Sequence, residues 1–227
     1  MYQRLLSSAG GGILSPSQQA EQNPCATIAI GLGGTGVECL RMLKREVYGR
    51  IRPDDPKAEV PSYRNIRFLA IDSDPGSMGK WEETGALDWN TEVLDISGPD
   101  SDALWANLPA IRQLPFMQWL SPGLKPMGSV GTGGVRQMGR LLLFQRCSQF
   151  IQKLTDLITS VRAGLSHSAE LCIHIFTGMG GGTGSGIFLD VCYLVQYVLE
   201  TLGLQDKAQT CGYFFLPDVN LAKVQIP

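Results

Sequence analysis

The stretch GMGGGTGSG at residues 178–186 decides the fold of this chain. It follows an apolar, strand-like run at residues 171–176, and apolar residues recur after it at helical spacing across residues 187–198. Because glycine lacks a Cβ, such a turn brings several backbone N–H groups close to an anion. The helix that follows adds free N–H groups and the positive end of its dipole. The stretch therefore predicts a phosphate-binding loop rather than a flexible linker, with the hydroxyls of Thr183 and Ser185 as further donors.

A second glycine-rich turn, GLGGTG at residues 31–36, also lies between an apolar run (residues 27–30) and a helical pattern. Alone it fits G-x-G-x-x-G, the fingerprint of dinucleotide-binding folds. Residues 66–71 predict another strand that ends at Asp72, where such a fold places a ribose-binding carboxylate. Asp72 lies 36 positions beyond the last glycine of the turn, whereas the usual spacing is about 20. An NAD- or FAD-dependent enzyme is therefore an alternative, and it leaves residues 178–186 unexplained.

A third glycine-rich turn, GSVGTGG at residues 128–134, precedes a helical pattern from about residue 135 to residue 161. Three turns that each open a helix can converge on one polyphosphate at the carboxyl edge of a parallel sheet. Arg136 and Arg140 lie in the first helical turns after the third one. Each arginine can pair with phosphate oxygens in a bidentate manner, or it can simply solvate a helix face.

Repeated strand–turn–helix units predict an α/β fold with a mostly parallel sheet and helices on both faces. Residues 1–24 are rich in Gly, Ser and Gln, and we expect them to form a flexible leader. Residues 25–227 then form one domain. Within it, a Trp- and Pro-rich segment at about residues 76–127 is either an irregular excursion packed on its own aromatic cluster or a surface that binds a partner.

The composition favours a cytoplasmic protein that binds neither nucleic acid nor a membrane. The net charge is −2 and basic residues form no run, so an electrostatic footprint for nucleic acid is missing. No apolar stretch reaches 18 residues, and the N-terminus lacks a signal-peptide core. Six cysteines are scattered without C-x-x-C spacing, which indicates a reducing compartment and no structural zinc site. His174 lies in a predicted buried strand, and we expect it to be a core residue.

The sequence GGGTGSG at residues 180–186 resembles the phosphate-binding signature of the tubulin/FtsZ family. Four further motifs are similar to that family in the same order along the chain: its first phosphate loop (residues 31–36), its second loop (residues 70–74), its γ-phosphate loop (residues 131–140) and the strand after the signature helix (residues 213–217). The resemblance spans about residues 26–217. It implies the Rossmann-like, GTP-binding domain of a divergent prokaryotic tubulin-like protein.

The resemblance implies that GTP or GDP, with Mg²⁺, is the ligand. Residues 180–186 would cradle the α- and β-phosphates, residues 33–36 would hold the diphosphate from the other side, and residues 131–134 with Arg136 would sense the γ-phosphate. The implied nucleotide-binding residues are Gly33, Gly34, Thr35, Gly36, Glu38, Asp72, Gly131, Thr132, Gly133, Gly134, Arg136, Gly180, Gly181, Gly182, Thr183, Gly184, Ser185 and Gly186.

Two acidic residues have an open role. Asp72 and Asp74 can bind magnesium through water, as hard carboxylates do, or they can cap the loop in which they lie. We also expect Gly182→Val to abolish protection by nucleotide, because a β-branched side chain blocks close approach and a positive φ.

The chain departs from the family at several positions. Val37 and Glu38 stand where FtsZ has asparagines that read guanine, although the Glu38 carboxylate can accept the N1 and N2 hydrogens of that base. Arg136 and Gln137 replace a Pro-Glu pair. The sequence ends at Pro227, before the central helix, the second domain and the acidic loop that completes hydrolysis in the family.

We therefore expect nucleotide binding by this chain and GTPase activity only in a longer or assembled form, and the catalytic residues are unknown. Self-association into protofilaments is implied for the longer protein. A regulatory module that keeps the fold without polymerising is the remaining alternative.

Overall fold

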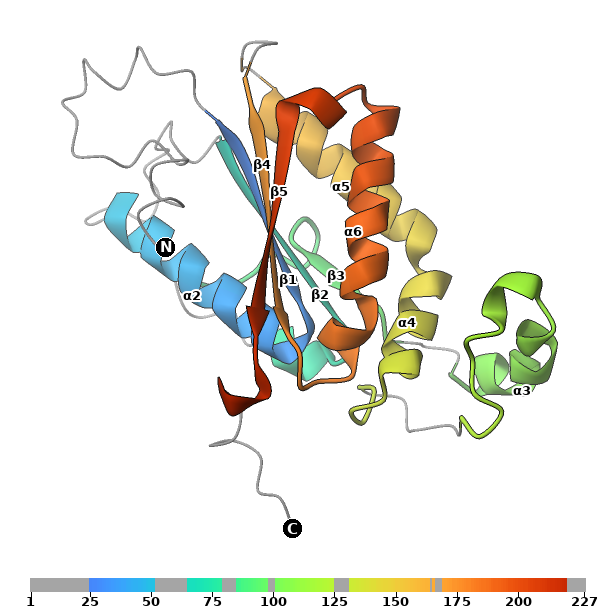
Figure 1. The fold of residues 1–227 in the computed structure, drawn as a ribbon. Coiled ribbons are helices and arrows are strands. Elements are labelled where there is room, and N and C mark those ends of the chain that lie inside the picture. Colours follow the sequence, from blue (N-terminus) through green and yellow to red (C-terminus); the bar gives the residue numbers. More distant parts are fainter. Residues whose placement is uncertain are drawn as a thin grey trace, which may run out of the picture.

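The computed structural model describes residues 25–51, 65–78, 85–97, 101–124, 131–163, 165 and 169–219. The expected leader at residues 1–24 and the first part of the third glycine turn, residues 128–130, lie outside the described residues. Within them, one sheet has the strand order β3-β2-β1-β4-β5, and all neighbouring strands pair in parallel (Figure 1). The strands are β1 (Ala26–Leu32), β2 (Ile66–Asp72), β3 (Val93–Asp95), β4 (Leu171–Gly178) and β5 (Ala208–Phe215).

The strand order reverses between β1 and β4. The chain runs from β1 outward through β2 to β3, and then returns to the other side of β1 to form β4 and β5. In open α/β sheets, ligands bind outside the carboxyl ends of the strands where the order reverses in this way. The carboxyl ends of β1 and β4 are therefore the place to look for a site.

Helices cover both faces of the sheet, as expected. Figure 1 shows α2 (Gly33–Ile51) on one face and α5 (Cys147–Arg162) and α6 (Thr183–Thr201) on the other. Alternate side chains of β1 point to opposite faces of the sheet. Ile28 and Ile30 pack with α5 and α6, whereas Ala29 packs with α2. Because both faces are buried, the central strands read as continuous apolar runs. The predicted α/β class with a parallel sheet is confirmed.

The single helix predicted for residues 135–161 is two helices. They are α4 (Arg136–Gln145) and α5, and they meet at Arg146, which has φ −104° and ψ 10°. The Arg146 N–H bonds to the Leu143 carbonyl at 2.9 Å, so the last turn of α4 tightens before the chain changes direction. Neither Gly nor Pro marks the break, which explains why helical periodicity alone runs through it.

The Trp- and Pro-rich segment is more regular than the irregular excursion that we considered. It supplies β3, which pairs in parallel with β2, and α3 (Ser101–Arg112). Trp119 packs against the core on the α5 and α6 side, and the Arg140 guanidinium lies 4.5 Å from its ring centroid. Trp89 is exposed. The side chains of Trp81 and Trp105 lie outside the described residues, so the expected aromatic cluster stays untested for them.

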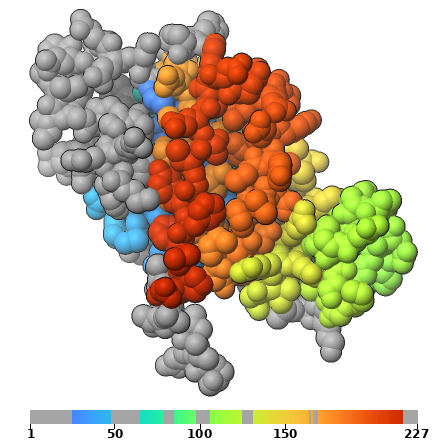
Figure 2. All heavy atoms as spheres, in the orientation of Figure 1, coloured from blue at the N-terminus to red at the C-terminus, as the bar shows by residue number. Residues whose placement is uncertain are grey.

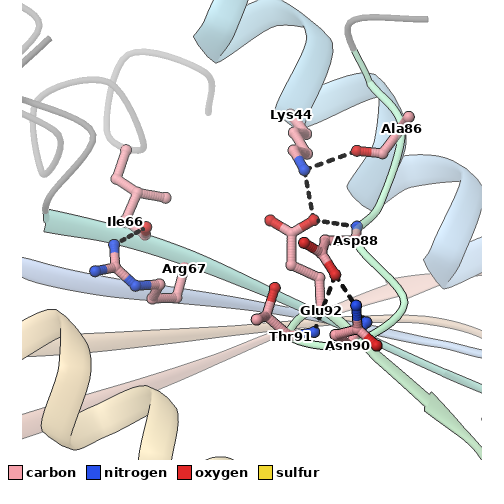
Figure 3. Close-up of polar contacts among 8 residues, drawn as sticks. All are labelled: Lys44, Ile66, Arg67, Ala86, Asp88, Asn90, Thr91 and Glu92. Atoms are coloured by element: carbon pink, nitrogen blue, oxygen red, sulfur yellow. Dashed lines mark hydrogen bonds and ion pairs between the residues drawn. The ribbon is translucent and has the colours of Figure 1, made fainter. Parts of the chain in front are cut away.

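A buried ion pair fixes the turn that leads into β3 (Figure 3). Lys44 of α2 is only 6% exposed, and its ammonium contacts the Glu92 carboxylate at 2.5 Å and the Ala86 carbonyl at 2.7 Å. The same carboxylate oxygen accepts a hydrogen bond from the Asp88 N–H at 2.8 Å, and the Asp88 carboxylate accepts one from the Asn90 N–H at 2.7 Å. This network joins the edge of the sheet to the helix that opens at the first glycine turn.

The outer side of α6 remains exposed although the helix is apolar almost all round. Leu189, Tyr193 and Tyr197, each four residues apart, are exposed, whereas Val191 and Val195 are buried. Figure 2 shows α6 and β5 next to one another on this face, and the rings of Phe188 and Phe214 meet edge to face at 5.4 Å. In the described ranges, no helix is long and apolar enough to cross a membrane.

Candidate functional site

Two glycine turns meet at the carboxyl ends of β1 and β4. α2 begins at Gly33, directly after β1, and α6 begins at Thr183, five residues after β4 ends at Gly178. Both helix N-termini therefore place free N–H groups and positive dipole ends at one location. Between them lies a cavity of about 100 Å³, lined by Leu32, Gly33, Gly34, Thr35, Gly178, Gly181, Gly182, Thr183 and Gly184. None of these lining residues carries a negative charge.

The helices begin earlier than expected, so many of the glycines lie in first helical turns rather than in open loops. Their small size allows backbone to pack directly on backbone. A Cβ on Gly33, which has φ +65°, would lie 2.6 Å from the Gly184 nitrogen, and a Cβ on Gly184 would lie 2.5 Å from the Leu32 carbonyl oxygen. A Cβ on Gly36 would lie 2.3 Å from the Phe176 oxygen in β4. These distances are too short for any side chain.

The third glycine turn packs against the signature loop in the same way. A Cβ on Gly182 would lie 2.3 Å from the Thr132 hydroxyl oxygen, and a Cβ on Gly186 would lie 2.3 Å from the Arg136 carbonyl oxygen. Gly131, Gly133 and Gly134 all have positive φ, at 75°, 55° and 81°. Gly133 and Gly134 are exposed beside the site and do not line the cavity.

The hydroxyl of Thr183 joins three loops. It lies 2.7 Å from the Ser73 hydroxyl and 3.3 Å from the Thr132 hydroxyl. The Ser73 carbonyl accepts the Gly131 N–H at 2.9 Å, so the loop after β2 and the third glycine turn are tied together as well. The Ser185 hydroxyl donates to the Gly181 carbonyl inside its own loop. Both hydroxyls that we expected to face phosphate are therefore bonded to protein atoms.

The two acids after β2 cap their own loop. Asp72 is buried, and its carboxylate accepts hydrogen bonds from the Ser73 N–H at 2.7 Å and from the Ser77 hydroxyl. Burial raises the pKa of Asp72 above its ordinary value, although these hydrogen bonds oppose the shift. Asp74 accepts the Gly76 N–H at 2.9 Å. The capping role is thus present, and the magnesium role stays a prediction; among the described residues, His, Cys, Asp and Glu form no cluster of three or more that could hold a metal ion.

The sequence profile of the family described as "Tubulin like" matches residues 28–226, which span the whole described sheet from the third residue of β1 onward and all three glycine turns. The chain belongs to this tubulin-like family. It is similar to two solved structures from Haloferax volcanii. One is CetZ2 in a GTPγS-bound protofilament, at 16% identity and TM-score 0.41 over 82% of this chain. The other is CetZ1 as a GDP-bound monomer, at 15% identity and TM-score 0.44 over 83% of this chain.

The tubulin-like chain spans only part of those structures, 39% of the CetZ2 chain and 41% of the CetZ1 chain. No curated protein matches the sequence.

In the tubulin-like domain, the two arginines after the third turn have different surroundings. The Arg136 guanidinium donates to the Met179 carbonyl of the signature loop at 3.1 Å, so it lies at the site. Arg140 makes a two-point ion pair with Asp190 of α6, with both N···O distances at 2.9 Å. Arg140 therefore fastens α4 to α6 and leaves Arg136 as the arginine at the site. Glu38 is exposed on α2, outside the cavity lining.

Two residues of the site were not found from the sequence. Ser73 holds Thr183, and Phe215 accepts the Met179 N–H at 2.8 Å, which ties the signature loop to the end of β5. Ser73 could have been noticed as the residue that follows a strand-ending acid. The Phe215 contact uses only a backbone carbonyl, so the type of residue at this position does not predict it. His174, in contrast, is a buried core residue as expected; burial lowers its pKa, and Nδ1 lies 3.1 Å from the Tyr213 hydroxyl.

Proposed function

We propose that this tubulin-like domain binds GTP or GDP, with the phosphates in the cavity between the N-termini of α2 and α6. One observation carries the proposal: the cavity is lined by the backbone of two glycine turns, two helices begin there, and the lining residues include no acid. Backbone N–H groups at helix N-termini donate to phosphate oxygens, and the helix dipoles favour their negative charge.

The size of the cavity suits phosphate groups and not a whole nucleotide. At about 100 Å³ it holds only a small part of the ligand, so the ribose and base would extend beyond it. Residues 180–186 and 33–36 would hold the phosphates from two sides, and Arg136 would add a positive charge near the signature loop. Glu38 would face the base as an acceptor for guanine N–H groups.

Magnesium binding by Asp72 and Asp74 is a further part of the proposal. Because burial raises the pKa of Asp72, a nearby divalent cation would favour the ionised carboxylate and lower that pKa. Both carboxylates already accept hydrogen bonds within their loop, which is consistent with contact to the metal through water.

Hydrolysis and self-association are proposed only for a longer or assembled form. The CetZ2 structure is described as a GTPγS-bound protofilament, and assembly of the present protein in that manner is our inference from family membership. The alternatives remain a dinucleotide-dependent enzyme and a regulatory module of the same fold that neither binds nucleotide nor polymerises.

A melting-temperature screen with GTP, GDP, ATP and NAD, with and without magnesium, tests the ligand. At a hundredfold excess over Kd, we expect GTP and GDP to raise Tm by about 5–10 °C. A larger shift with ATP would overturn guanine as the base, and a shift with NAD alone would overturn GTP and GDP as ligands in favour of the dinucleotide alternative. The absence of any shift would favour the regulatory module.

Gly181→Ala separates binding from folding. A Cβ at this position meets no atom within 4 Å, although Gly181 lines the cavity, so the methyl group enters the open space that the phosphates would use. We expect the affinity for GTP to fall about tenfold or more, with the Tm of the free protein unchanged within about 2 °C. Gly123→Ala, in an exposed turn outside the cavity, is the control and should change neither value.

A further inference from the structure

Two cysteines meet at the edge of the sheet opposite the glycine turns. Cys25 directly precedes β1, and Cys172 is the second residue of β4, where Thr27 is its partner in register. Side chains alternate along a strand, so Cys25 lies on the same face as Thr27 and Cys172. Their sulfur atoms are 3.3 Å apart, and the Cys25 thiol donates to the Cys172 sulfur. Both residues are free cysteines and both are partly exposed.

The hydrogen bond makes the two sulfurs chemically different. It lowers the pKa of Cys172 to about 7, although burial opposes the shift. The same hydrogen bond, together with burial, raises the pKa of Cys25 well above the ordinary value. The lowered pKa favours the thiolate of Cys172, and the thiolate is the reactive form of cysteine. Burial instead raises the pKa of Cys39, Cys147 and Cys192.

We propose that Cys25 and Cys172 form a reversible disulfide in response to a hydroperoxide and so tie the amino ends of β1 and β4 together. In the first step, with hydrogen peroxide as the oxidant, the Cys172 thiolate attacks one peroxide oxygen; an S–O bond forms, the O–O bond breaks, and hydroxide leaves and takes up the proton that Cys172 had released, which gives water. Cys172 is then a sulfenic acid.

In the second step, Cys25 gives up its proton and attacks the Cys172 sulfur. The S–S bond forms, the S–O bond breaks, and the oxygen leaves as water with that proton. Overall, two thiols and one hydrogen peroxide give one disulfide and two waters, and two electrons pass from the sulfurs to the peroxide. A thiol reductant reverses the reaction by exchange.

The structure leaves room for this bond. A disulfide is about 2.04 Å long, so the sulfurs must approach by about 1.3 Å from their 3.3 Å separation. Cys25 lies just before the strand, and the first backbone bond to the neighbouring segment is made by the Ala26 N–H to the Glu170 carbonyl. We expect rotation of the Cys25 side chain, with a small shift of its backbone, to supply this approach.

The bond would close a loop between positions 147 residues apart in the chain. Long loops of this kind give large stabilisation in the chain-entropy description of disulfides. We expect the oxidised protein to melt about 10 °C above the reduced protein.

Peptide mapping tests the proposal directly. The reduced protein is treated with an equimolar amount of hydrogen peroxide, free thiols are blocked with N-ethylmaleimide, and the protein is digested without reductant for mass spectrometry. We expect a peptide pair linked through Cys25 and Cys172, which dithiothreitol abolishes. Recovery of both cysteines as alkylated thiols, or of Cys172 linked to a different cysteine, would overturn the proposal.

Three variants separate the two steps. Cys172→Ser should give neither the linked peptides nor the Tm increase. Cys25→Ser should accumulate a sulfenic acid at Cys172, detected with dimedone, and should show no Tm increase. Cys192→Ser, which alters a cysteine on α6, should still form the disulfide and keep the Tm increase. If Cys172 carries a lasting sulfenic acid in the unaltered protein as well, the second step does not occur and the proposal fails.

Discussion

Gly182→Ala, and Gly182→Val still more, should lower the free energy of unfolding by about 3 kcal/mol, because they drive the signature loop away from the third glycine turn. A Cβ at Gly182 would lie 2.3 Å from the Thr132 hydroxyl oxygen, 2.6 Å from the Gly134 carbonyl carbon and 2.6 Å from the Val135 nitrogen. Two of these atoms belong to the backbone and cannot rotate aside. A loss of this size is a large part of the total stability of an ordinary domain, about 5–15 kcal/mol.

Urea unfolding followed by circular dichroism measures this loss. Gly181→Ala, one residue earlier, is the matched control, since its Cβ meets nothing within 4 Å. An unfolding midpoint for Gly182→Ala equal to that of Gly181→Ala would show that the loops do not pack as described. From the sequence we attributed the effect of Gly182→Val partly to a positive φ, and that part is wrong. Gly182 has φ −84°, so close packing and not a positive φ excludes a side chain there.

Lys44→Met should destabilise the protein by about 3–5 kcal/mol, because it leaves the Glu92 carboxylate buried without its cation. The side chains of Lys44 and Glu92 are only 8% and 12% exposed, so water cannot replace the lost partner at low cost. The Ala86 carbonyl would lose its donor as well. We expect the turn before β3 to detach from α2, and β3 to be the first strand to lose protection from hydrogen exchange.

The double variant Lys44→Met, Glu92→Leu should recover part of the lost stability, since it removes both charges together. Arg45→Met, which removes an exposed positive charge from the same helix, should change the free energy of unfolding by less than about 0.5 kcal/mol. A double variant as unstable as the sum of the two single variants would show that the pair is not coupled.

The parts of the fold that could be predicted from the sequence are the buried apolar strands and the glycine turns that follow two of them. β1, β2 and β4 appear as apolar runs, and the turns after β1 and β4 contain glycines that few other structures require. β3 has only three residues, too few to show a period. The break at Arg146 has no Gly or Pro to mark it. Both features depend on packing between segments that are far apart in the sequence.

For the candidate site, the sequence predicted glycine turns that the structure brings together, but it assigned their glycines only one purpose. We expected them to let a phosphate come close, and the structure shows that Gly33, Gly36, Gly182 and Gly184 first let the protein's own backbone come close to itself. Thr183 is also bound to protein partners, because Ser73 and Thr132 arrive from loops that no local pattern places beside it.

The mutual packing of these loops affects both the cost of binding a ligand and the stability of the domain. Hydrogen bonds among Thr183, Ser73 and Gly131 form without a ligand. The proposed phosphate site is therefore already ordered, and binding of a ligand would cost little conformational entropy. Two of these loops follow β2 and β4, so we expect a change that loosens them to weaken the centre of the sheet as well. Under the nucleotide binding that we propose, mutations that stiffen this region should both slow nucleotide exchange and make the whole domain more resistant to heat.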